Sequence, residues 1–416
     1  MQKIEIMSPA GSFASLHTAV KAGANSVYFG IEQLNMRARS ANNFKTSDLP
    51  EIVKICKENN VRTYLTVNTI LYDHDLVLMR KICDAAKENN ISAVIASDIA
   101  AIQYAHSIGL EVHISTQQNV SNIEAVRFFA QYADVIVLAR ELNLKQIQDI
   151  IEQIKKEKIT GPSDKLVQIE LFAHGALCVS ISGKCHMSLS SQNASANRGA
   201  CIQNCRRSYR VIDEENGEEL VLENKYIMSP KDLCTIGFLD EIIGAGVSVL
   251  KLEGRGRSAD YVHTVTKCYC EAADAIENNS YTEEKIENWT KELASVFNRG
   301  FWQGGYYLGK QLGEWSGKHG SQATKQNEYI GRVTNYFRKN NIGEFIIETG
   351  EINIGDDLFV TGDNTGVIKL KLENFYLNDM PGTVAKKGDV ITIPFSERIR
   401  INDKLFLSKD RISKQI

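Results

Sequence analysis

The residues of this chain most suited to chemistry are four cysteines that lie close together in the sequence. Six residues separate Cys178 from Cys185 and three separate Cys201 from Cys205, so all four fall within 28 residues. Cys234 follows at what we expect to be the start of the next helix. Thiols gathered in one irregular segment fit a tetrathiolate site for zinc or for an iron–sulfur cluster. Structural zinc usually takes closely paired cysteines, and only Cys201 and Cys205 resemble such a pair, which favours the cluster.

The remaining four cysteines fall on segments with helical periodicity, where a buried free thiol is the ordinary interpretation: Cys56, Cys83, Cys268 and Cys270. The total of nine is odd, which favours thiols or metal ligands over disulfides and an intracellular, cytoplasmic location. Buried free thiols also remain the alternative interpretation of the four clustered cysteines.

The cysteine segment is basic. Residues 171–212 contain no aspartate or glutamate, but they contain Lys184, Arg198, Arg206, Arg207 and Arg210. A basic loop of this kind can bind RNA phosphates or a carboxylate substrate. It can equally compensate the negative charge of thiolate ligands.

Polar side chains also follow the predicted strands, and several of them are arginines, which bind carboxylates well. We expect a small dicarboxylate and RNA to contact Arg37, Arg39, Asn68, Gln117, Arg140, Lys251, Glu253, Arg255 and Arg257. Glu170 and His174 lie on one strand and are candidates for an acid–base pair, or for a supporting role beside the cysteines.

The elements that must position these residues alternate between short apolar runs and amphipathic segments. Strand-like runs begin near Ile4, Val27, Thr63, Ala93, Val112, Val135, Val167 and Val247. Helical stripes lie between them, for example at Leu49, Ile52, Val53 and Cys56. Eight such units predict an α/β fold, a TIM-like (β/α)8 barrel. An open Rossmann-like sheet is the alternative, but no Gly-x-Gly-x-x-Gly turn follows the first strand.

The chain divides into two predicted domains. Residues 1–315 form the barrel, with a cysteine-rich insertion (about 176–226) after the seventh strand and a helical extension (about 277–315). The insertion falls at the face where barrels of this kind build active sites. Residues 316–327 have the composition of a linker, and 328–416 have the short strands and turns of a small antiparallel β-barrel.

Composition excludes several function classes. The formal net charge is −3, so any preference for nucleic acid has to be local. No apolar run is long enough to cross a membrane, and the N-terminus lacks the core of a signal peptide. The motifs Gly-x-Ser-x-Gly, His-Glu-x-x-His and the P-loop are absent, which weakens a hydrolase interpretation.

Residues 170–188 (ELFAHGALCVSISGKCHMS), followed by Asn197–Cys201 and Cys205-Arg206, resemble the signature of the collagenase-like peptidase family of unclassified mechanism. Further matching blocks are Ser8-Pro9-Ala10-Gly11, residues 229–234 (SPKDLC) and residues 251–255 (KLEGR). The resemblance covers essentially the whole chain. Within the family, the two-domain form is most similar to the prephenate-dependent tRNA uridine 5-hydroxylation proteins.

The resemblance implies an oxygen-sensitive [4Fe–4S] cluster and hydroxylation without molecular oxygen, with tRNA as partner, wobble uridine as target and prephenate as co-substrate. It implies Cys178, Cys185 and Cys201 as ligands, with Cys205 as the fourth and Cys234 in reserve. The C-terminal domain resembles the second domain of translation GTPases. A collagenase-like metallopeptidase, or a non-catalytic RNA-binding protein with a structural metal such as zinc, remains the alternative. A homo-oligomer is possible.

Overall fold

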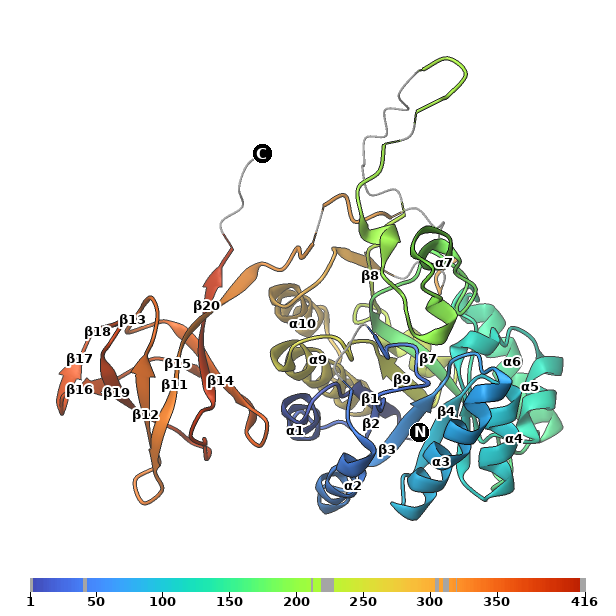
Figure 1. Ribbon diagram of the computed structural model, residues 1–416, viewed down its shortest axis with the longest axis horizontal. Coiled ribbons are helices and arrows are strands. Elements are labelled where there is room, and N and C mark those ends of the chain that lie inside the picture. The colour runs from blue at the N-terminus through green and yellow to red at the C-terminus, as the bar shows by residue number, and fades with distance from the viewer. Residues whose placement is uncertain are drawn as a thin grey trace.

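The computed structural model describes residues 3–39, 43–210, 212–217, 228–303, 307–309, 314–318 and 320–411. Figure 1 shows two bodies side by side, a large one built from strands and surrounding helices and a smaller one built from strands.

The large body is the predicted barrel. Eight parallel strands pair in sequence order and close because the last of them pairs with both the first and the seventh. They are β1 (Glu5–Pro9), β2 (Ser26–Phe29), β3 (Arg62–Val67), β4 (Ala93–Ala96), β5 (Glu111–Ile114), β6 (Val135–Val137), β7 (Gln168–Gly175) and β9 (Val249–Leu252). All eight predicted strands are therefore confirmed, and the closed order excludes the open sheet.

Helices cover the outside of the barrel, each with its apolar side against the strands. In α2, Leu49, Ile52 and Cys56 are buried, as their spacing predicts. Asn143 begins α6 with a capping box that includes Gln146. The outer helices are α1 (Phe13–Lys21), α2 (Leu49–Glu58), α3 (Leu76–Glu88), α4 (Ile99–Ser107), α5 (Ile123–Ala130), α6 (Leu144–Glu157), α8 (Leu239–Gly244), α9 (Ala259–Glu277) and α10 (Glu283–Ser295). No helix in the described ranges is long and apolar enough to span a membrane.

Two of the predicted sequence blocks pack directly against each other at the top of the barrel. A Cβ on Gly11 would lie 2.0 Å from the Arg255 carbonyl oxygen, and a Cβ on Gly254 would lie 3.2 Å from Pro9 Cγ. Only glycine permits these approaches. The block that opens the chain and the block that follows β9 therefore form one closely packed unit beneath the insertion.

The insertion leaves the barrel after β7 and contains α7 (Met187–Gln192) and the short 3₁₀ turns Ala196–Arg198 and Asn204–Arg206. It returns as β8 (Asp232–Cys234), which pairs antiparallel with the end of β7 and parallel with β10 (Phe301–Gln303). The prediction that Cys234 starts a helix is wrong, because it ends this extra strand. The pairing with β7 extends the sheet beyond the barrel and holds both ends of the insertion.

The smaller body has an eight-stranded antiparallel sheet, in the order β15-β14-β20-β11-β12-β19-β16-β17, and a two-stranded sheet of β13 and β18 around a separate apolar core. Its strands are β11 (Lys325–Phe337), β12 (Ile342–Ile347), β13 (Glu351–Asn353), β14 (Asp357–Gly362), β15 (Gly366–Lys371), β16 (Phe375–Leu377), β17 (Met380–Gly382), β18 (Val384–Lys386), β19 (Val390–Pro394) and β20 (Lys404–Asp410). Because β11 begins at Lys325, the segment predicted as a linker ends earlier than 327.

The two bodies meet where β15 lies against α1 and α9. Ala259, Phe359 and Val367 form a small buried apolar cluster there. Lys369 Nζ donates to Thr264 Oγ1 (2.8 Å), and Asn327 Nδ2 donates to Asp260 Oδ2 (2.8 Å). The contact therefore combines apolar burial with direct hydrogen bonds.

Candidate active site at the mouth of the barrel

The four clustered cysteines line one cavity. Its volume is about 160 Å³, and its wall includes Cys178, Cys185, Cys201 and Cys205 from the insertion. Cys178 is exposed and the other three are half-buried. The opposite wall belongs to the barrel, at the carboxyl ends of its strands. The structure thus brings the insertion over the face where the sequence placed it.

The four thiols are near enough to influence one another's ionisation. Burial raises the pKa of Cys205, the Arg206 guanidinium opposes this, and the neighbouring charges of Cys178, Cys201 and Cys185 raise it further. Burial likewise raises the pKa of Cys185. Four anionic sulfurs around one cavity repel each other, so a cationic group bound between them would stabilise the thiolate forms.

The spacing of the thiols bears on which group they suit. Within the described ranges, no three histidine, cysteine or carboxylate side chains are grouped closely enough to hold a metal ion. A tetrahedral zinc with Zn–S bonds of about 2.3 Å needs its sulfurs roughly 4 Å apart. In a four-iron cluster each thiolate binds a different iron, so the sulfurs stand farther apart. Four cysteine thiols are the donor set both of a tetrathiolate zinc site and of an iron–sulfur cluster.

Cys234 lies apart from this group. It is buried at the end of β8, it does not line the cavity, and burial raises its pKa to about 11. The thiols of Cys56 and Cys83 are likewise buried among the outer helices, where burial raises the pKa of each to about 12.

The barrel wall of the cavity is polar and mostly uncharged near β3 and β5. Asn68 Nδ2 donates to Ser115 Oγ (3.3 Å) and to Gln117 Oε1 (3.4 Å), and its Oδ1 accepts from the Met36 backbone N–H (3.2 Å). Asn68, Ser115 and Gln117 all line the cavity. Two of the predicted binding residues are therefore adjacent and fixed by mutual hydrogen bonds.

Glu253 is the carboxylate of the site. It follows β9, and its oxygens accept from Arg37 Nη2 (2.5 Å) and from the Tyr28 hydroxyl (3.0 Å). Burial alone would raise its pKa, but the guanidiniums of Arg37 and Arg255 hold it at about 2. Arg255 itself is buried, donates to Asn35 Oδ1 and Thr66 Oγ1 (3.1 Å each), and has a pKa that burial lowers to about 10.

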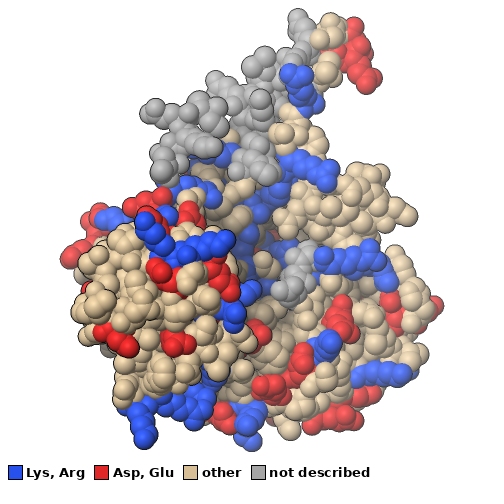
Figure 2. All heavy atoms as spheres, turned by 60° about the vertical axis from the view of Figure 1, so that its left-hand side comes forward, with Lys and Arg blue, Asp and Glu red and all other residues tan. Residues whose placement is uncertain are grey.

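A second cavity adjoins the first on the far side of Glu253 and shares Cys178, Cys201 and Cys205 with it. Its wall carries five arginines: Arg37, Arg140, Arg206, Arg257 and Arg299. Figure 2 shows Lys and Arg side chains gathered in a hollow of this face beside the C-terminal domain. We refer to this space as the arginine cavity.

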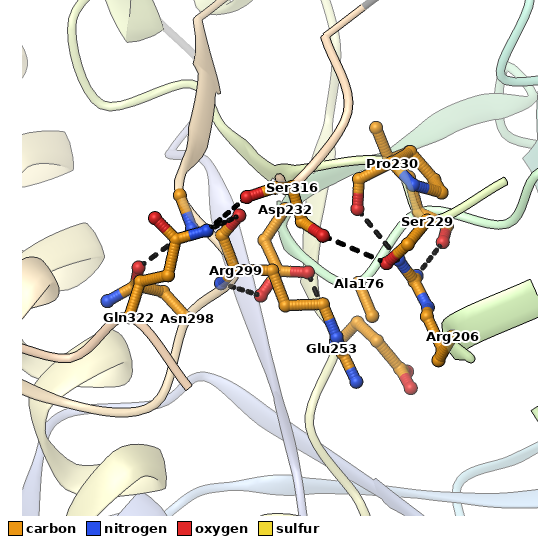
Figure 3. Close-up of polar contacts among 12 residues, drawn as sticks. Ala176, Arg206, Ser229, Pro230, Asp232, Glu253, Asn298, Arg299, Ser316 and Gln322 are labelled. Atoms are coloured by element: carbon orange, nitrogen blue, oxygen red, sulfur yellow. Dashed lines mark hydrogen bonds and ion pairs between the residues drawn. The ribbon is translucent and has the colours of Figure 1, made fainter. Parts of the chain in front are cut away.

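Only part of this positive charge is compensated. Arg37 pairs with Glu253 (2.5 Å) and Arg299 with Asp232 (3.3 Å), whereas no carboxylate in the described part of the chain forms an ion pair with Arg140, Arg206 or Arg257. Figure 3 shows Arg206 and Arg299 on either side of Glu253, with Asp232 beside Arg299. Burial, and then the charge of Arg299, lower the pKa of both Arg206 and Arg257.

Backbone and aromatic contacts hold these arginines in place. Arg206 Nη1 donates to Ser229 Oγ (2.9 Å) and the Pro230 carbonyl oxygen (2.7 Å), while Arg257 lies over the Phe297 ring at 3.5 Å. Arg140 lies over the Phe172 ring at 4.1 Å, and its Nε has no hydrogen-bond partner among the described residues. Fixed guanidiniums without carboxylates form a ready site for an anion.

Two predictions about site residues differ from the arrangement in the structure. Arg39 is exposed and lines neither cavity, and its backbone N–H donates to the Gly199 carbonyl oxygen (3.2 Å). Glu170 and His174 do not form an acid–base pair. Glu170 is bonded to Lys251 Nζ (2.8 Å), whereas His174 packs among Tyr261, Tyr269 and Phe301.

A register shift explains the failed pair. Residues four apart on a regular strand share a face, but β7 has an irregularity between Phe172 and His174. Glu170 therefore points into the barrel, and His174 lies against α9. Burial lowers the pKa of His174 to about 3, so its ring is neutral at physiological pH.

The sequence also left two cavity residues unassigned. Arg206 was noted only as one of the basic residues of the cysteine segment, and Arg299 fell within the predicted helical extension (about 277–315) without being singled out. Arg299 reaches the site because β10 pairs with β8 and its backbone N–H donates to Asp232 Oδ2 (3.2 Å). Only the long-range pairing of β10 reveals this position.

Comparison with known proteins identifies the family. Residues 11–317 match the family model described as Peptidase family U32. The chain belongs to this family. A Porphyromonas gingivalis protein named "Collagenase" is 55% identical over 402 residues, covering 97% of each chain. The Bacillus subtilis "tRNA hydroxylation protein P1" is 31% identical over 346 residues, covering 80% of this chain and 78% of that one.

Another relative is named for a different RNA. The Escherichia coli "23S rRNA 5-hydroxycytidine C2501 synthase" is 33% identical over 275 residues, which is 66% of this chain and 40% of that protein. Relatives of this U32 chain thus carry both peptidase and RNA-hydroxylation names.

Proposed function

We propose that this U32 protein is a tRNA-modifying enzyme that hydroxylates the wobble uridine to 5-hydroxyuridine without molecular oxygen. In this proposal prephenate is the co-substrate and a [4Fe–4S] cluster is the resident cofactor. The observation that carries the proposal is the direct contact between a cavity walled by four cysteines and a cavity walled by five arginines.

The cluster would be held by Cys178, Cys185, Cys201 and Cys205. Cys205 lines the cavity with the other three whereas Cys234 is buried behind it, which supports Cys205 as the fourth ligand. When bound, such a cluster supplies electron transfer or a Lewis-acidic iron at the mouth of the barrel.

The protein's own residues would do the rest. Arg140, Arg206 and Arg257 would bind the carboxylates of prephenate, since each is fixed by neighbours and unpaired with an acid in the described ranges. Asn68 and Gln117 would orient a base in the cysteine cavity through neutral hydrogen bonds. The antiparallel C-terminal domain beside the site would add backbone contacts to tRNA, consistent with the names of the RNA-modifying relatives.

A peptidase is the second candidate, because the relative with 55% identity is named "Collagenase". A peptidase needs an activated nucleophile or an activated water. No histidine lines either cavity in the described part of the chain, so no Ser–His or Cys–His pair stands there. This arrangement favours the hydroxylase.

The two functions are separated by one set of purified, anaerobically prepared samples. The hydroxylase should form 5-hydroxyuridine in unmodified tRNA only when prephenate is added, and should leave a gelatin-like peptide intact. Peptide cleavage that depends on the four cysteines, without any modified uridine, would reverse the assignment.

A further inference from the structure

A row of ionisable side chains runs through the interior of the barrel. TIM-like barrels usually fill this space with branched apolar side chains. Here the apolar residues of the interior, such as Met7, Tyr64 and Ile95, share it with Glu111, His113, Glu170 and Lys251. We call these four residues the axial row. Charged groups in a barrel interior cost free energy to bury, so their presence calls for a role or a compensation.

The axial row connects the two ends of the barrel. Glu111 is the first residue of β5, at the end opposite the cysteines, and its side chain is 30% exposed. His113 and Glu170 have fully buried side chains, and Lys251 lines the cysteine cavity with 7% of its side chain exposed. One end of the row therefore meets solvent and the other meets the proposed active site.

Three close approaches join the four side chains of the axial row. His113 Nε2 lies 3.1 Å from Glu111 Oε1, and Lys251 Nζ donates to Glu170 Oε1 at 2.8 Å. Between these two pairs, His113 Nδ1 faces Glu170 Oε2 across 3.8 Å. Both atoms are buried and have no hydrogen-bond partner in the described ranges. An imidazole nitrogen and a carboxylate oxygen left free toward each other can share a proton after a small movement.

The charges around the row keep it close to neutral. Arg62 Nη2 pairs with Glu111 (2.8 Å), and Glu5 accepts from the Tyr64 hydroxyl (2.7 Å), whose ring lies 4.5 Å from His113. Lys251 lies over the Tyr28 ring at 4.7 Å. The row and its neighbours therefore combine the carboxylates of Glu5, Glu111 and Glu170 with the cationic groups of Arg62 and Lys251.

We propose that Lys251 exchanges a proton with the ligand in the cavity, and that Glu170, His113 and Glu111 replace it from the opposite end of the barrel. This inference rests on the proposed function for its substrate. The Lys251 ammonium gives one proton to a basic atom of the ligand and becomes an amine. Glu170 passes a proton from His113 to that amine, and His113 regains one at Nε2 from solvent through Glu111. Nothing is oxidised or reduced in this sequence, and one proton crosses the barrel.

The test compares the full-length wild type with His113→Gln and Glu170→Gln. Glu5→Gln is the matched control, because it makes the same carboxylate-to-amide change as Glu170→Gln but outside the row, at the end of the barrel where Glu111 lies. In tRNA hydroxylation with prephenate, both row variants should lower kcat about 100-fold and leave KM within twofold. They should also flatten the pH profile of kcat. Glu5→Gln should stay within twofold of wild type.

A second measurement does not require activity. Calorimetry with inorganic phosphate as the probe, in buffers of different ionisation enthalpy, counts the protons taken up when an anion binds near Lys251. The wild type and Glu5→Gln should take up a measurable fraction of a proton, up to one, and His113→Gln should take up none. Melting curves identify a variant that fails to fold. If Glu170→Gln fails to fold, His113→Gln alone still tests the proton path.

The outcomes separate the two proposals. If wild-type protein makes no 5-hydroxyuridine but takes up a proton that depends on His113, the proposed function is wrong and the proton path is supported. If wild type is active and His113→Gln shows a normal kcat and an unchanged pH profile, the proton path is wrong and the proposed function is supported. Absence of proton uptake by the wild type on phosphate binding would also contradict the proton path.

Discussion

Arg37 Nη2 donates to Glu253 Oε1 at 2.5 Å, and this pair stands between the cysteine cavity and the arginine cavity. Arg37 comes from the loop after β2 and Glu253 follows β9, so the pair links the ends of the two strands that flank β1. Glu253 engages Arg37 and Tyr28, and among the described residues it forms no ion pair with Arg140, Arg206 or Arg257 of the arginine cavity.

This pair predicts a pH dependence of stability. The pKa of Glu253 falls from 4.5 to about 2 on folding. A carboxyl group whose pKa is lower in the folded state stabilises the protein at pH values above its pKa in the unfolded state. This stabilisation is lost as pH falls from about 4.5 toward 2. A shift of this size corresponds to about 3 kcal/mol. Urea unfolding at pH 7 and pH 3 should therefore show a larger loss in wild type than in Glu253→Gln. An equal loss in both proteins would show that Glu253 does not carry this effect.

The arginine cavity predicts a selective loss of small-ligand affinity. Arg257→Gln should weaken prephenate binding ten- to hundredfold, because a charge-assisted contact contributes about 1.5–3 kcal/mol. Arg39→Gln is the matched control, since Arg39 lines neither cavity and should bind as wild type does. Calorimetric titration measures both. Equal weakening in the two variants would point to a general electrostatic effect instead of a built site.

The cysteines should act as a set. Replacing Cys178, Cys185, Cys201 or Cys205 by serine should remove bound iron and the absorbance near 400 nm together, because each thiolate would hold one corner of the proposed cluster. Cys83→Ser, at a buried helical position, should keep both. Iron content and absorbance are read on anaerobically purified protein. Iron loss from Cys234→Ser but not from Cys205→Ser would show that Cys234, and not Cys205, is the fourth ligand.

The backbone at the start of the insertion requires glycine at position 175. Its φ is +106°, and an added Cβ would lie 2.6 Å from the Glu253 carbonyl oxygen. Gly175→Ala should lower the free energy of unfolding by several kcal/mol, since strain and steric conflict add. Gly217 has a φ of +75° with nothing within 4 Å, so Gly217→Ala should cost only about 1–2 kcal/mol. Similar losses at both positions would mean that the contact with Glu253 relaxes freely.

Local patterns predicted the barrel well because its strands and helices are regular. The apolar stripe of α2 and the buried run Ala93–Ala96 each follow from their own residues. The failed pair of Glu170 and His174 has a different cause, since it depends on an irregularity in how β7 pairs with β9. Arg299 similarly reaches the site only through the pairing of β10 with β8. Long-range pairing of this kind leaves no periodic trace in the sequence.

Mass spectrometry of tRNA nucleosides tests most directly whether this U32 protein hydroxylates tRNA uridine. The comparison uses cells that lack the protein and any redundant pathway, complemented with wild type or with Cys178→Ser. We predict that 5-hydroxyuridine is absent from the deletion strain, returns with wild type and does not return with Cys178→Ser. A normal level of 5-hydroxyuridine in the deletion strain would contradict the account.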